Sequence, residues 1–471
     1  MSKLVKSIRE AVISSGLKDG MTISFHHHLR SGDYVLNLVM DEIAALGIRD
    51  LKIDATSIHD GHWPLEKHIK NGTVTAIETP YIGPRVGKCV SEGDLKTPVT
   101  FVSHGGRPSR ISRGLEHIDV AFIGAPTADC MGNCTGKRGK SACGSLGYSF
   151  VDAEYADYTV IITDNLEPYP LFDRSISEEY VDAVVCVDSI GDPAGIVSGT
   201  TRMPRDPMAL LIAKYTAEAI HASGLLKDGM SFQTGAGGAP LAAAGFLRDI
   251  MIQEKIRGSY ALGGITGYMV DMLKEGCFEA IQDVQCFDLK AVESLRENPR
   301  HFEISSSQYS SPTAKSRASS SLDVVVLGAT QIDTDFNVNV HTDSNGYIIG
   351  GSGGHTDVAE DAKLAIIAAP LSRARIPVVV DQVLSKSTPG SSVDLLVTQY
   401  GIAVNTAREE NRELFERLKK AKLPLRDIRD LRKKAEELNG IPAPLALNRE
   451  KITGRILNRA EGELDLIYAV K

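Results

Sequence analysis

The chain alternates short apolar runs with amphipathic segments. Continuous apolar runs occur at VAFIG, TVIIT, VVVLG and IPVVV, each bounded by glycine or polar residues. Longer segments with apolar residues at helical spacing lie between such runs, among them VLNLVMDEIAALG and APLAAAGFLRDIMIQ. Apolar strands that alternate with helices are typical of a parallel sheet buried on both faces. The pattern therefore predicts an α/β protein built from open, layered domains.

Short motifs recur along the chain and indicate a duplication. They recur in the same order and at nearly constant spacing: LKDGM begins at 17 and 226, DVAFIGA at 119 is echoed by DVVVLGA at 323, and GSLG at 144 is echoed by GSGG at 351. In each copy a predicted helix precedes LKDGM and ends at a glycine, Gly16 or Gly224, as is common at helix C-termini. The chain is therefore predicted to contain two tandem copies of one α/β domain.

The domain limits follow from these copies. We expect the first domain over 1–215, including a connecting loop rich in Gly, Pro and Ser, and the second over 216–405. Residues 406–471 are rich in charge and predict a short helical C-terminal extension that returns to the fold. The Ser-rich segment 305–321 lies inside the second copy, and two interpretations stay open: a mobile surface loop, or a lid or docking segment.

Composition limits the class of protein further. The 471 residues carry a net charge of −8, whereas a nucleic-acid-binding surface is normally basic. The seven cysteines are scattered like reduced cytosolic thiols, and the spacing of Cys130, Cys134 and Cys143 is not that of a zinc site. The N-terminal residues lack the apolar core of a secretory signal, and no apolar run is long enough to span a membrane. We therefore expect a cytoplasmic protein without a metal, nucleic-acid or membrane partner.

Glycines gather at the ends of predicted strands in the second copy. Residues 234–240 (TGAGGAP) lie between a strand and a helix, Gly263 and Gly264 follow the next strand, and 350–355 (GGSGGH) lies downstream. Ligands of open α/β sheets bind beyond the carboxyl ends of the strands. Backbone amides at a helix N-terminus bind anions there or form an oxyanion hole. For a single loop of this kind, a tight strand–helix turn is the structural alternative.

Basic residues occupy the matching loops of the first copy. His26-His27-His28-Leu29-Arg30 stands at the turn that corresponds to 234–240, and His104-Gly105-Gly106-Arg107 forms a second basic loop. Charge-assisted hydrogen bonds from such side chains suit a carboxylate-rich ligand. Metal binding is disfavoured because three adjacent histidines on a strand cannot all face one site. Each histidine alone has a structural interpretation as a satisfied buried residue.

Together, these motifs resemble one family. The chain is similar to the α subunits of citrate lyase, a resemblance carried by SFHHHLRSGD, SHGGR, GSLGYSFVDA, MSFQTGAGGA, ALGGITGYMVD, ISSSQY, IDTDFNVNV, GSGGHTD and TPGSSVDLLVT. The resemblance implies a CoA-transferase fold and exchange of the acetyl thioester on an acyl carrier for citryl, with release of acetate. It implies citrate, acetyl-carrier and the β and γ (acyl carrier) subunits as partners in an oligomeric complex. It also implies no permanently held cofactor, since a CoA-type prosthetic group on the carrier, or free acetyl-CoA, supplies the thiol.

One position departs from the wider fold family. CoA transferases of the usual type use the glutamate of an S-E-N-G turn as nucleophile, and alignment on Gly264 places Leu262 at that position. Because leucine cannot be a nucleophile, we expect a citrate carboxylate to attack the thioester directly.

Site residues are predicted on this basis. Gly237, Gly238 and Gly264 are predicted to stabilise oxyanions through their backbone amides. Predicted substrate-binding residues are His26, His27, Arg30, His104, Arg107, Gln233, Gly235, Gly263, Gln308, Asn339, Gly353 and His355.

Other functions stay open at this point. They are a stand-alone CoA transferase for a small carboxylic acid, the α subunit of a citramalate lyase, a non-catalytic effector-binding module, and a structural subunit of a complex.

Overall fold

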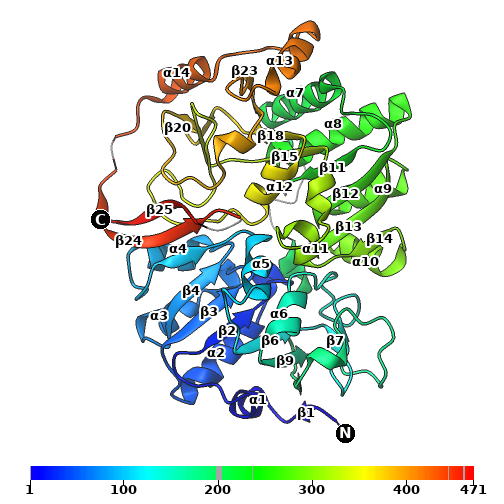
Figure 1. Ribbon diagram of the computed structural model, residues 1–471, viewed down its shortest axis with the longest axis vertical. Helices are drawn as coiled ribbons and strands as arrows, with labels where there is room; N and C mark the ends of the chain where they lie inside the picture. The colour runs from blue at the N-terminus through cyan, green and yellow to red at the C-terminus, as the bar shows by residue number, and fades with distance from the viewer. Residues whose placement is uncertain (1, 198–203, 236, 444, 460–461) are drawn as a thin grey trace.

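Two α/β units make up the molecule, which the computed structural model describes over residues 2–197, 204–235, 237–443, 445–459 and 462–471 (Figure 1). The first unit is built on a ten-stranded sheet in the order β1 (Leu4–Val5), β10 (Ala183–Cys186), β9 (Tyr158–Thr163), β6 (Val120–Gly124), β2 (Thr22–Phe25), β3 (Leu51–Ala55), β4 (Val74–Thr79), β5 (Val99–Phe101), β24 (Leu447–Leu457), β25 (Glu463–Val470). The second is built on an eight-stranded sheet in the order β14 (His301–Glu303), β13 (Phe278–Cys286), β12 (Gly258–Ile265), β11 (Ser231–Thr234), β15 (Val324–Leu327), β18 (Leu364–Ala368), β22 (Leu395–Thr398), β23 (Gly401–Val404).

The two sheets repeat one strand order. In the first unit β2 pairs in parallel with β3 and β6, and in the second β11 pairs in parallel with β12 and β15. A turn after the following strand is also repeated: the Asn133 amide donates to Asp129, and the Asn337 amide donates to Asp333. The tandem α/β fold predicted from the sequence echoes is thus present.

Helices lie on both faces of the sheets, as Figure 1 shows. The first unit contains α1 (Ile8–Ser14), α2 (Val35–Ala45), α3 (Leu65–Lys70), α4 (Pro84–Ser91), α5 (Gly106–Ser112) and α6 (Phe150–Tyr155). The second contains α7 (Pro207–Ser223), α8 (Gly238–Glu254), α9 (Gly267–Lys274), α10 (Leu289–Glu297), α11 (Ser306–Ser310) and α12 (His355–Asp361). Among the described residues, no helix combines the length and the apolar character needed to cross a membrane.

Local sequence explains most of these boundaries. The strands VAFI of β6 and VVVL of β15 are buried throughout, as expected for strands covered on both sides. Helix α7 starts where Asp206 accepts a hydrogen bond from the Ala209 amide, and it ends at Gly224 in the left-handed conformation (φ 80°). Residues 198–203 of the predicted connecting loop lie outside the described residues.

The segment IPVVV does not form the central strand that its apolar run predicted. The strand beside β15 is β18, whereas Ile376–Pro377 and Val379–Val380 are two short strands, β20 and β21, in small separate sheets. Proline explains the difference, because Pro377 has no N–H to donate within a central strand.

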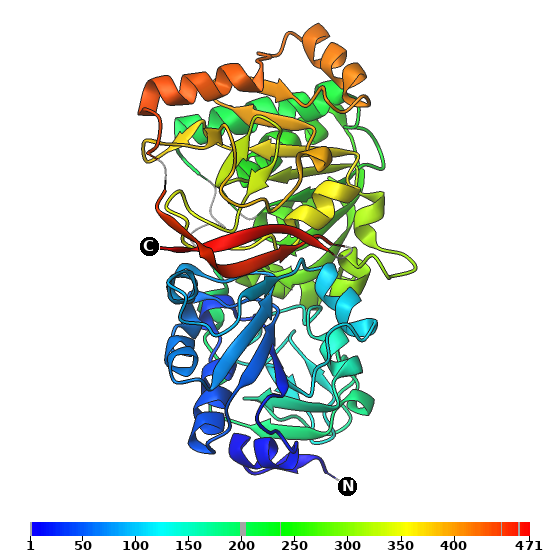
Figure 2. The same cartoon turned by 60° about the vertical axis from the view of Figure 1, so that its left-hand side comes forward.

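The C-terminal extension is helical only in its first part. Helices α13 (Asn411–Lys420) and α14 (Ile428–Asn439) pack against the second unit. The chain then forms the antiparallel hairpin β24–β25, and β24 pairs in parallel with β5 of the first unit. Figure 2 shows this hairpin, in red, lying across the junction between the two units. The prediction of helix for 447–470 was wrong because the partner strand lies more than 300 residues away in sequence.

Candidate active site

A cavity of about 740 Å³ lies between the two units. From the first unit it is lined by Tyr81, His104 and Tyr148. From the second unit its lining includes Gln233, Thr234, Gly235, Gly237, Gly238, Gly264, Phe287, Tyr309, Gly328, Gly351, Ser352, Gly354, His355 and Arg373. Several of them come shortly after parallel strands, the position where open α/β sheets bind ligands: Tyr81 follows β4, His104 follows β5, Gly235 follows β11 and Phe287 follows β13.

The glycine-rich loop forms one wall of the cavity. Its Gly235 amide donates to the Val326 carbonyl at 2.8 Å, which holds the loop against β15. Gly237 follows with φ 140°, a conformation that requires glycine, and is the N-cap of the 17-residue helix α8 without a side-chain cap. The Gly237 amide donates to the Gly235 carbonyl at 3.0 Å, so the prediction that it stabilises an oxyanion was wrong. Amides of the first helical turn, which begins at Gly238, have no intrahelical partner, so this wall still offers donors and partial positive charge. Ala236, in the middle of the loop, lies outside the described residues.

Gln233 and Tyr309 form an oriented pair beside this loop. The Gln233 Nε2 donates to the Tyr309 hydroxyl at 2.9 Å, so the hydroxyl's own proton is left to donate elsewhere. Burial raises the pKa of Tyr309, which keeps that proton in place at neutral pH. A Cβ at Gly354 would stand 2.4 Å from the hydroxyl, so glycine there makes room for it. Gln233 Oε1 is buried and has no partner among the described residues.

Histidines and tyrosines of the first unit form the opposite wall. The His104 ring lies 4.4 Å from Tyr148 and 6.0 Å from His27, centroid to centroid. Burial, together with the nearby Arg107, lowers the pKa of His104 to about 3. His104 is therefore neutral near pH 7 and offers one N–H donor. The described residues place no hydrogen-bond partner on its ring, whereas both ring nitrogens of His27 are occupied by Thr56 and Gln285.

Arg30 lies behind this wall. Its guanidinium stands 4.8 Å above the ring of Phe287, and Nη1 donates to the Ile196 carbonyl at 3.3 Å. Burial lowers the pKa of Arg30, while the nearby Tyr81 and Tyr148 act in the opposite direction. No carboxylate pairs with Arg30 among the described residues. A largely buried cation without a carboxylate partner is suited to an anionic ligand.

The second unit holds the His104 loop in place. The His104 amide donates to the Gly353 carbonyl at 2.8 Å. Asp357, on α12, accepts from the Ser103 hydroxyl at 2.6 Å and from the Gly105 amide at 2.8 Å. Arg459, which follows β24, donates to the Ser310 carbonyl at 2.8 Å and to Asp361 at 2.7 Å. The C-terminal hairpin thus anchors the same junction from the first unit's sheet.

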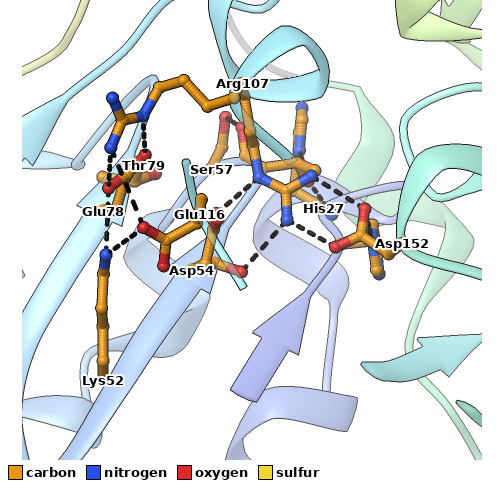
Figure 3. A network of polar contacts seen from close by, with 12 residues as sticks. His27, Lys52, Asp54, Ser57, Glu78, Thr79, Arg107, Glu116 and Asp152 are labelled. Carbon is orange, nitrogen blue, oxygen red and sulfur yellow. Dashed lines mark hydrogen bonds and ion pairs between the residues drawn. The ribbon is translucent and has the colours of Figure 1, made fainter. Parts of the chain in front are cut away.

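Arg107 has a different place from the one its motif suggested. It lies between two buried carboxylates, with Nε 2.5 Å from Asp54 and Nη2 2.5 Å from Asp152 (Figure 3). Only 2% of its surface is exposed, and it is not among the described residues of the cavity lining. Its charge is therefore already compensated within the protein. His26 belongs to the same network, since its Nε2 lies 2.9 Å from Asp152.

The network continues through the first unit, as Figure 3 shows. Lys52 contacts Glu78 at 3.0 Å and Glu116 at 2.5 Å. Burial raises the pKa of Asp54 to about 6, although Arg107 opposes the shift. Burial also acts to raise the pKa of Asp152, but Arg107 and His26 outweigh it and hold that pKa below its ordinary value. Arg107 donates to both carboxylate oxygens of Asp152, at 2.8 and 2.5 Å, and to one carboxylate oxygen of Asp54, at 2.5 Å.

Some of the remaining predicted residues lie outside the cavity. Gln308 is exposed, whereas its neighbour Tyr309 points inward. Both ends of the Asn339 amide group are used within the second unit: Nδ2 donates to Gln331 and Thr342, and Oδ1 accepts from the Ser385 hydroxyl. Both residues are therefore placed away from the described lining.

Other predicted residues lie at or against the cavity wall. His355 lines the cavity, but its ring nitrogens contact Thr388 Oγ1 and the Gly328 carbonyl. Gly263 and Gly353 are not in the described lining but pack behind it: a Cβ would stand 2.9 Å from the Gln233 amide group and 3.2 Å from His104 Nε2, respectively.

Residues of 305–321 prove to be packed. Tyr309 and Ser319 are buried, and Arg317 pairs with Asp361 at 2.9 Å. The lining residues that sequence reasoning missed include the large or polar side chains of Tyr81, Tyr148, Phe287, Tyr309 and Arg373. Two of them lie in motifs that were singled out: Tyr148 in GSLGYSFVDA and Tyr309 in ISSSQY.

Comparison with known proteins identifies the family. Residues 1–470 match the family model described as citrate lyase, alpha subunit (CitF). The chain belongs to the citrate lyase alpha subunit family. It is 46% identical over 469 residues to the citrate lyase alpha chain of Klebsiella pneumoniae, with 100% of this chain and 92% of that protein covered. The citrate lyase alpha chain of Escherichia coli (strain K12) is 47% identical over 469 residues, which cover 100% of this chain and 91% of that protein.

Solved structures agree with this assignment. A Streptococcus mutans protein described as an alpha subunit of citrate lyase, in complex with citrate, is 48% identical with a TM-score of 0.97. The match covers 100% of this chain and 92% of that one. The alpha subunit of a malonate decarboxylase from Acinetobacter baumannii has a TM-score of 0.66 at 15% identity, covering 94% of this chain and 93% of that one. At that identity the likeness concerns the fold alone.

Proposed function

We propose that this chain transfers the thiol of an acetyl thioester from the acetyl group to citrate, within a citrate lyase complex. The reaction converts acetyl thioester and citrate into citryl thioester and acetate. The observation that carries the proposal is the cavity itself, in a chain of this family. It places the N-terminal end of α8, beginning at Gly238, and the hydrogen-bond donors Tyr309 and His104 around one space.

In the first step, a citrate carboxylate oxygen attacks the acetyl carbonyl carbon. The C–S bond breaks, the thiolate leaves, and a mixed acetyl–citryl anhydride remains. Negative charge develops on the acetyl oxygen as the tetrahedral intermediate forms. The Gly238 amide, the Tyr309 hydroxyl and the His104 N–H are donors of the kind that stabilise such an oxyanion.

In the second step, the thiolate attacks the citryl carbonyl of the anhydride. The bond between that carbonyl carbon and the bridging oxygen breaks, and acetate leaves with the oxygen. No proton is gained or lost overall, so the chemistry depends on positioning and on charge stabilisation rather than on an acid or a base. A neutral His104 suits this role, since a charged imidazolium is not needed.

The lining supports direct attack over a covalent glutamyl intermediate. Leu262, at the expected nucleophile position, is only 2% exposed and packs in an apolar cluster with Tyr148. Among the described lining residues there is no glutamate, cysteine or lysine. The one carboxylate there, Asp206, is exposed and caps α7.

Citrate recognition is assigned to the first unit's side of the cavity. Arg30 is a largely buried cation that has no carboxylate partner among the described residues, and it contacts the Phe287 ring that lines the cavity. The Gln233 Oε1 is a buried acceptor suited to the citrate hydroxyl. Arg107 and His26 are assigned a supporting role, since the charge of Arg107 is compensated by Asp54 and Asp152 and the His26 ring contacts Asp152.

The thiol is proposed to come from the CoA-type prosthetic group of an acyl carrier (γ) subunit, so that the chain holds no cofactor of its own. A β subunit would then cleave the citryl thioester, and the complex would act in the cytoplasm. All seven cysteines are free thiols, which is consistent with that compartment.

Isotope transfer in a single turnover tests the mechanism. The chain in excess over acetyl thioester is mixed with citrate labelled with ¹⁸O in its carboxylates, and the acetate is analysed by mass spectrometry. Direct attack predicts one ¹⁸O in each acetate molecule. A glutamyl intermediate predicts unlabelled acetate in the first turnover, because its oxygen would come from the enzyme, and such a result would refute the proposal.

Substrate preference separates the alternatives. A much higher kcat/KM with acetyl-carrier than with free acetyl-CoA is expected for a citrate lyase subunit. Equal values would favour a stand-alone CoA transferase. Citramalate, which has a methyl group where citrate has a carboxymethyl group, is expected to react poorly, and preference for it would favour a citramalate lyase.

A further inference from the structure

A short basic hairpin stands at the cavity opposite the first unit. It consists of β19 (Ser372–Arg373) and β20 (Ile376–Pro377), with Arg373 paired to Ile376. Arg373 lines the cavity, and the side chains of both Arg373 and Arg375 are exposed. The hairpin therefore places one arginine at the cavity and a second within two residues of it.

Arg373 is the only lysine or arginine among the described residues of the lining. The histidines there are uncharged near neutral pH, because burial lowers the pKa of His104 to about 3 and that of His355 to about 4. Arg373 and Arg375 have no ion pair with any described residue, although ion pairs are frequent elsewhere on the surface, as between Arg248 and Glu275. Both guanidinium groups are thus available to an anion that enters from solvent.

The backbone of the hairpin supports a functional role. Its two turn residues, Ala374 and Arg375, have φ of 49° and 67°. Turns of this kind normally use Asn-Gly or a similar pair, because side chains with a Cβ disfavour positive φ. Strained conformations of this kind concentrate at sites that hold ligands.

Two anionic ligands belong to the proposed reaction, and the two arginines considered for them, Arg30 and Arg373, differ in burial. Arg30 is largely buried behind Phe287 and beside Tyr81 and Tyr148, which suits the compact, enclosed citrate. Arg373 is exposed, where a long ligand would extend toward solvent. A CoA-type arm has its thioester at one end and its phosphates at the other, so its phosphates lie away from the reacting atoms.

We propose that Arg373 and Arg375 form a subsite for the phosphate groups of the CoA-type arm that carries the thioester. The inference rests on the proposed function and specifies how the thioester substrate is held. The planar guanidinium groups match phosphate oxygens through paired charge-assisted hydrogen bonds. The contact positions the substrate and takes no part in bond making or breaking.

Two thioesters that differ in their phosphates test the subsite. Arg373→Ala, Arg375→Ala and the double variant are assayed in the full chain with acetyl-CoA and with acetyl-N-acetylcysteamine, which has no phosphate. Loss of a hydrogen-bonded charge pair is expected to raise the KM for acetyl-CoA about tenfold per arginine. The kcat, the KM for citrate and all constants for acetyl-N-acetylcysteamine are expected to stay within about twofold. Arg412→Ala, an exposed arginine on α13, is the matched control.

Each alternative result has a defined meaning. Equal losses with both thioesters would overturn the subsite, as would a rise in KM for citrate alone or no change in the double variant. Direct binding separates this inference from the proposed function: calorimetric titration with CoA and with pantetheine, which has no phosphate, needs no turnover. A further outcome is that the wild-type chain binds CoA more tightly than pantetheine, with the difference lost in the double variant, and yet forms no citryl-CoA from acetyl-CoA. That result would support the subsite and contradict the transfer reaction with free CoA.

Discussion

Replacing Arg107 by methionine distinguishes a structural role from a substrate-binding one. Arg107 is the shared partner of Asp54 and Asp152, and all three side chains are almost completely buried. Methionine fills much of the same volume but leaves two carboxylates in a low-dielectric interior without a cation. Breaking a buried ion pair by removing one partner costs about 3–5 kcal/mol of folding free energy.

The expected change in melting temperature follows from the size of the unit. For a domain of about 150–250 residues, 1 kcal/mol shifts Tm by about 2–4 °C. Arg107→Met is therefore expected to lower the Tm of the first unit's transition by about 6–20 °C. Differential scanning calorimetry of the full chain measures this shift. Arg107→Lys keeps the charge but loses the bidentate fork, so a smaller shift is expected.

A second comparison tests the cause of the loss. Adding Asp54→Asn and Asp152→Asn to Arg107→Met removes the uncompensated charges, and part of the lost Tm is expected to return. The reasoning would be refuted if Arg107→Met changed Tm by less than about 2 °C while raising the KM for citrate tenfold. That outcome would return Arg107 to the substrate site.

Three further predictions concern catalysis and pH. Tyr309→Phe is expected to lower kcat about 10²–10³-fold, as loss of one oxyanion donor does, while the KM for citrate stays within about threefold of the wild-type value. A change in KM alone would contradict the donor role. Burial lowers the pKa of His104 to about 3 and of His355 to about 4, so neither ring changes its charge near neutral pH. The ratio of kcat/KM for wild type to that for His104→Asn, in which the ionisation of citrate cancels, is expected to be independent of pH between about 5 and 8, and a histidine-like step in that ratio would contradict the reasoning. Burial raises the pKa of Asp54 to about 6, so the folded protein takes up this proton at a higher pH than the unfolded chain does. The unfolding free energy of the wild type relative to that of Asp54→Asn, measured by urea titration, is therefore expected to rise as the pH falls from 8 to 5. A difference that is independent of pH would refute this prediction.

The contrast between Arg30 and Arg107 shows that the sequence did not predict which arginine has carboxylate partners. Both stand in basic loops of the first copy, and both were expected to bind carboxylates. Tertiary structure supplies Arg107 with two aspartates from β3 and α6, whereas Arg30 receives none among the described residues. The difference depends on which strands and helices become neighbours, and the motifs themselves contain no information about that pairing.

The His104 loop illustrates the same limit across the two units. Its position depends on Asp357 and on the Gly353 carbonyl, about 250 residues away in sequence. Tyr309 likewise reaches the cavity because its segment packs against Gln233 rather than forming a mobile loop. No periodicity in the chain marks these contacts.

Sequence alone determined the fold class, the duplication, the family and the glycine loop that begins α8, because each depends on short-range patterns that are repeated in the chain. Apolar strand runs, helix-ending glycines and recurrent motifs act locally and therefore remain visible in one dimension. Only the tertiary structure decided which basic residues keep a free charge, which hydroxyl points into the cavity and where the C-terminal hairpin pairs. These properties arise from burial and from partners hundreds of residues apart, and burial determines whether a charge is compensated or left for a ligand.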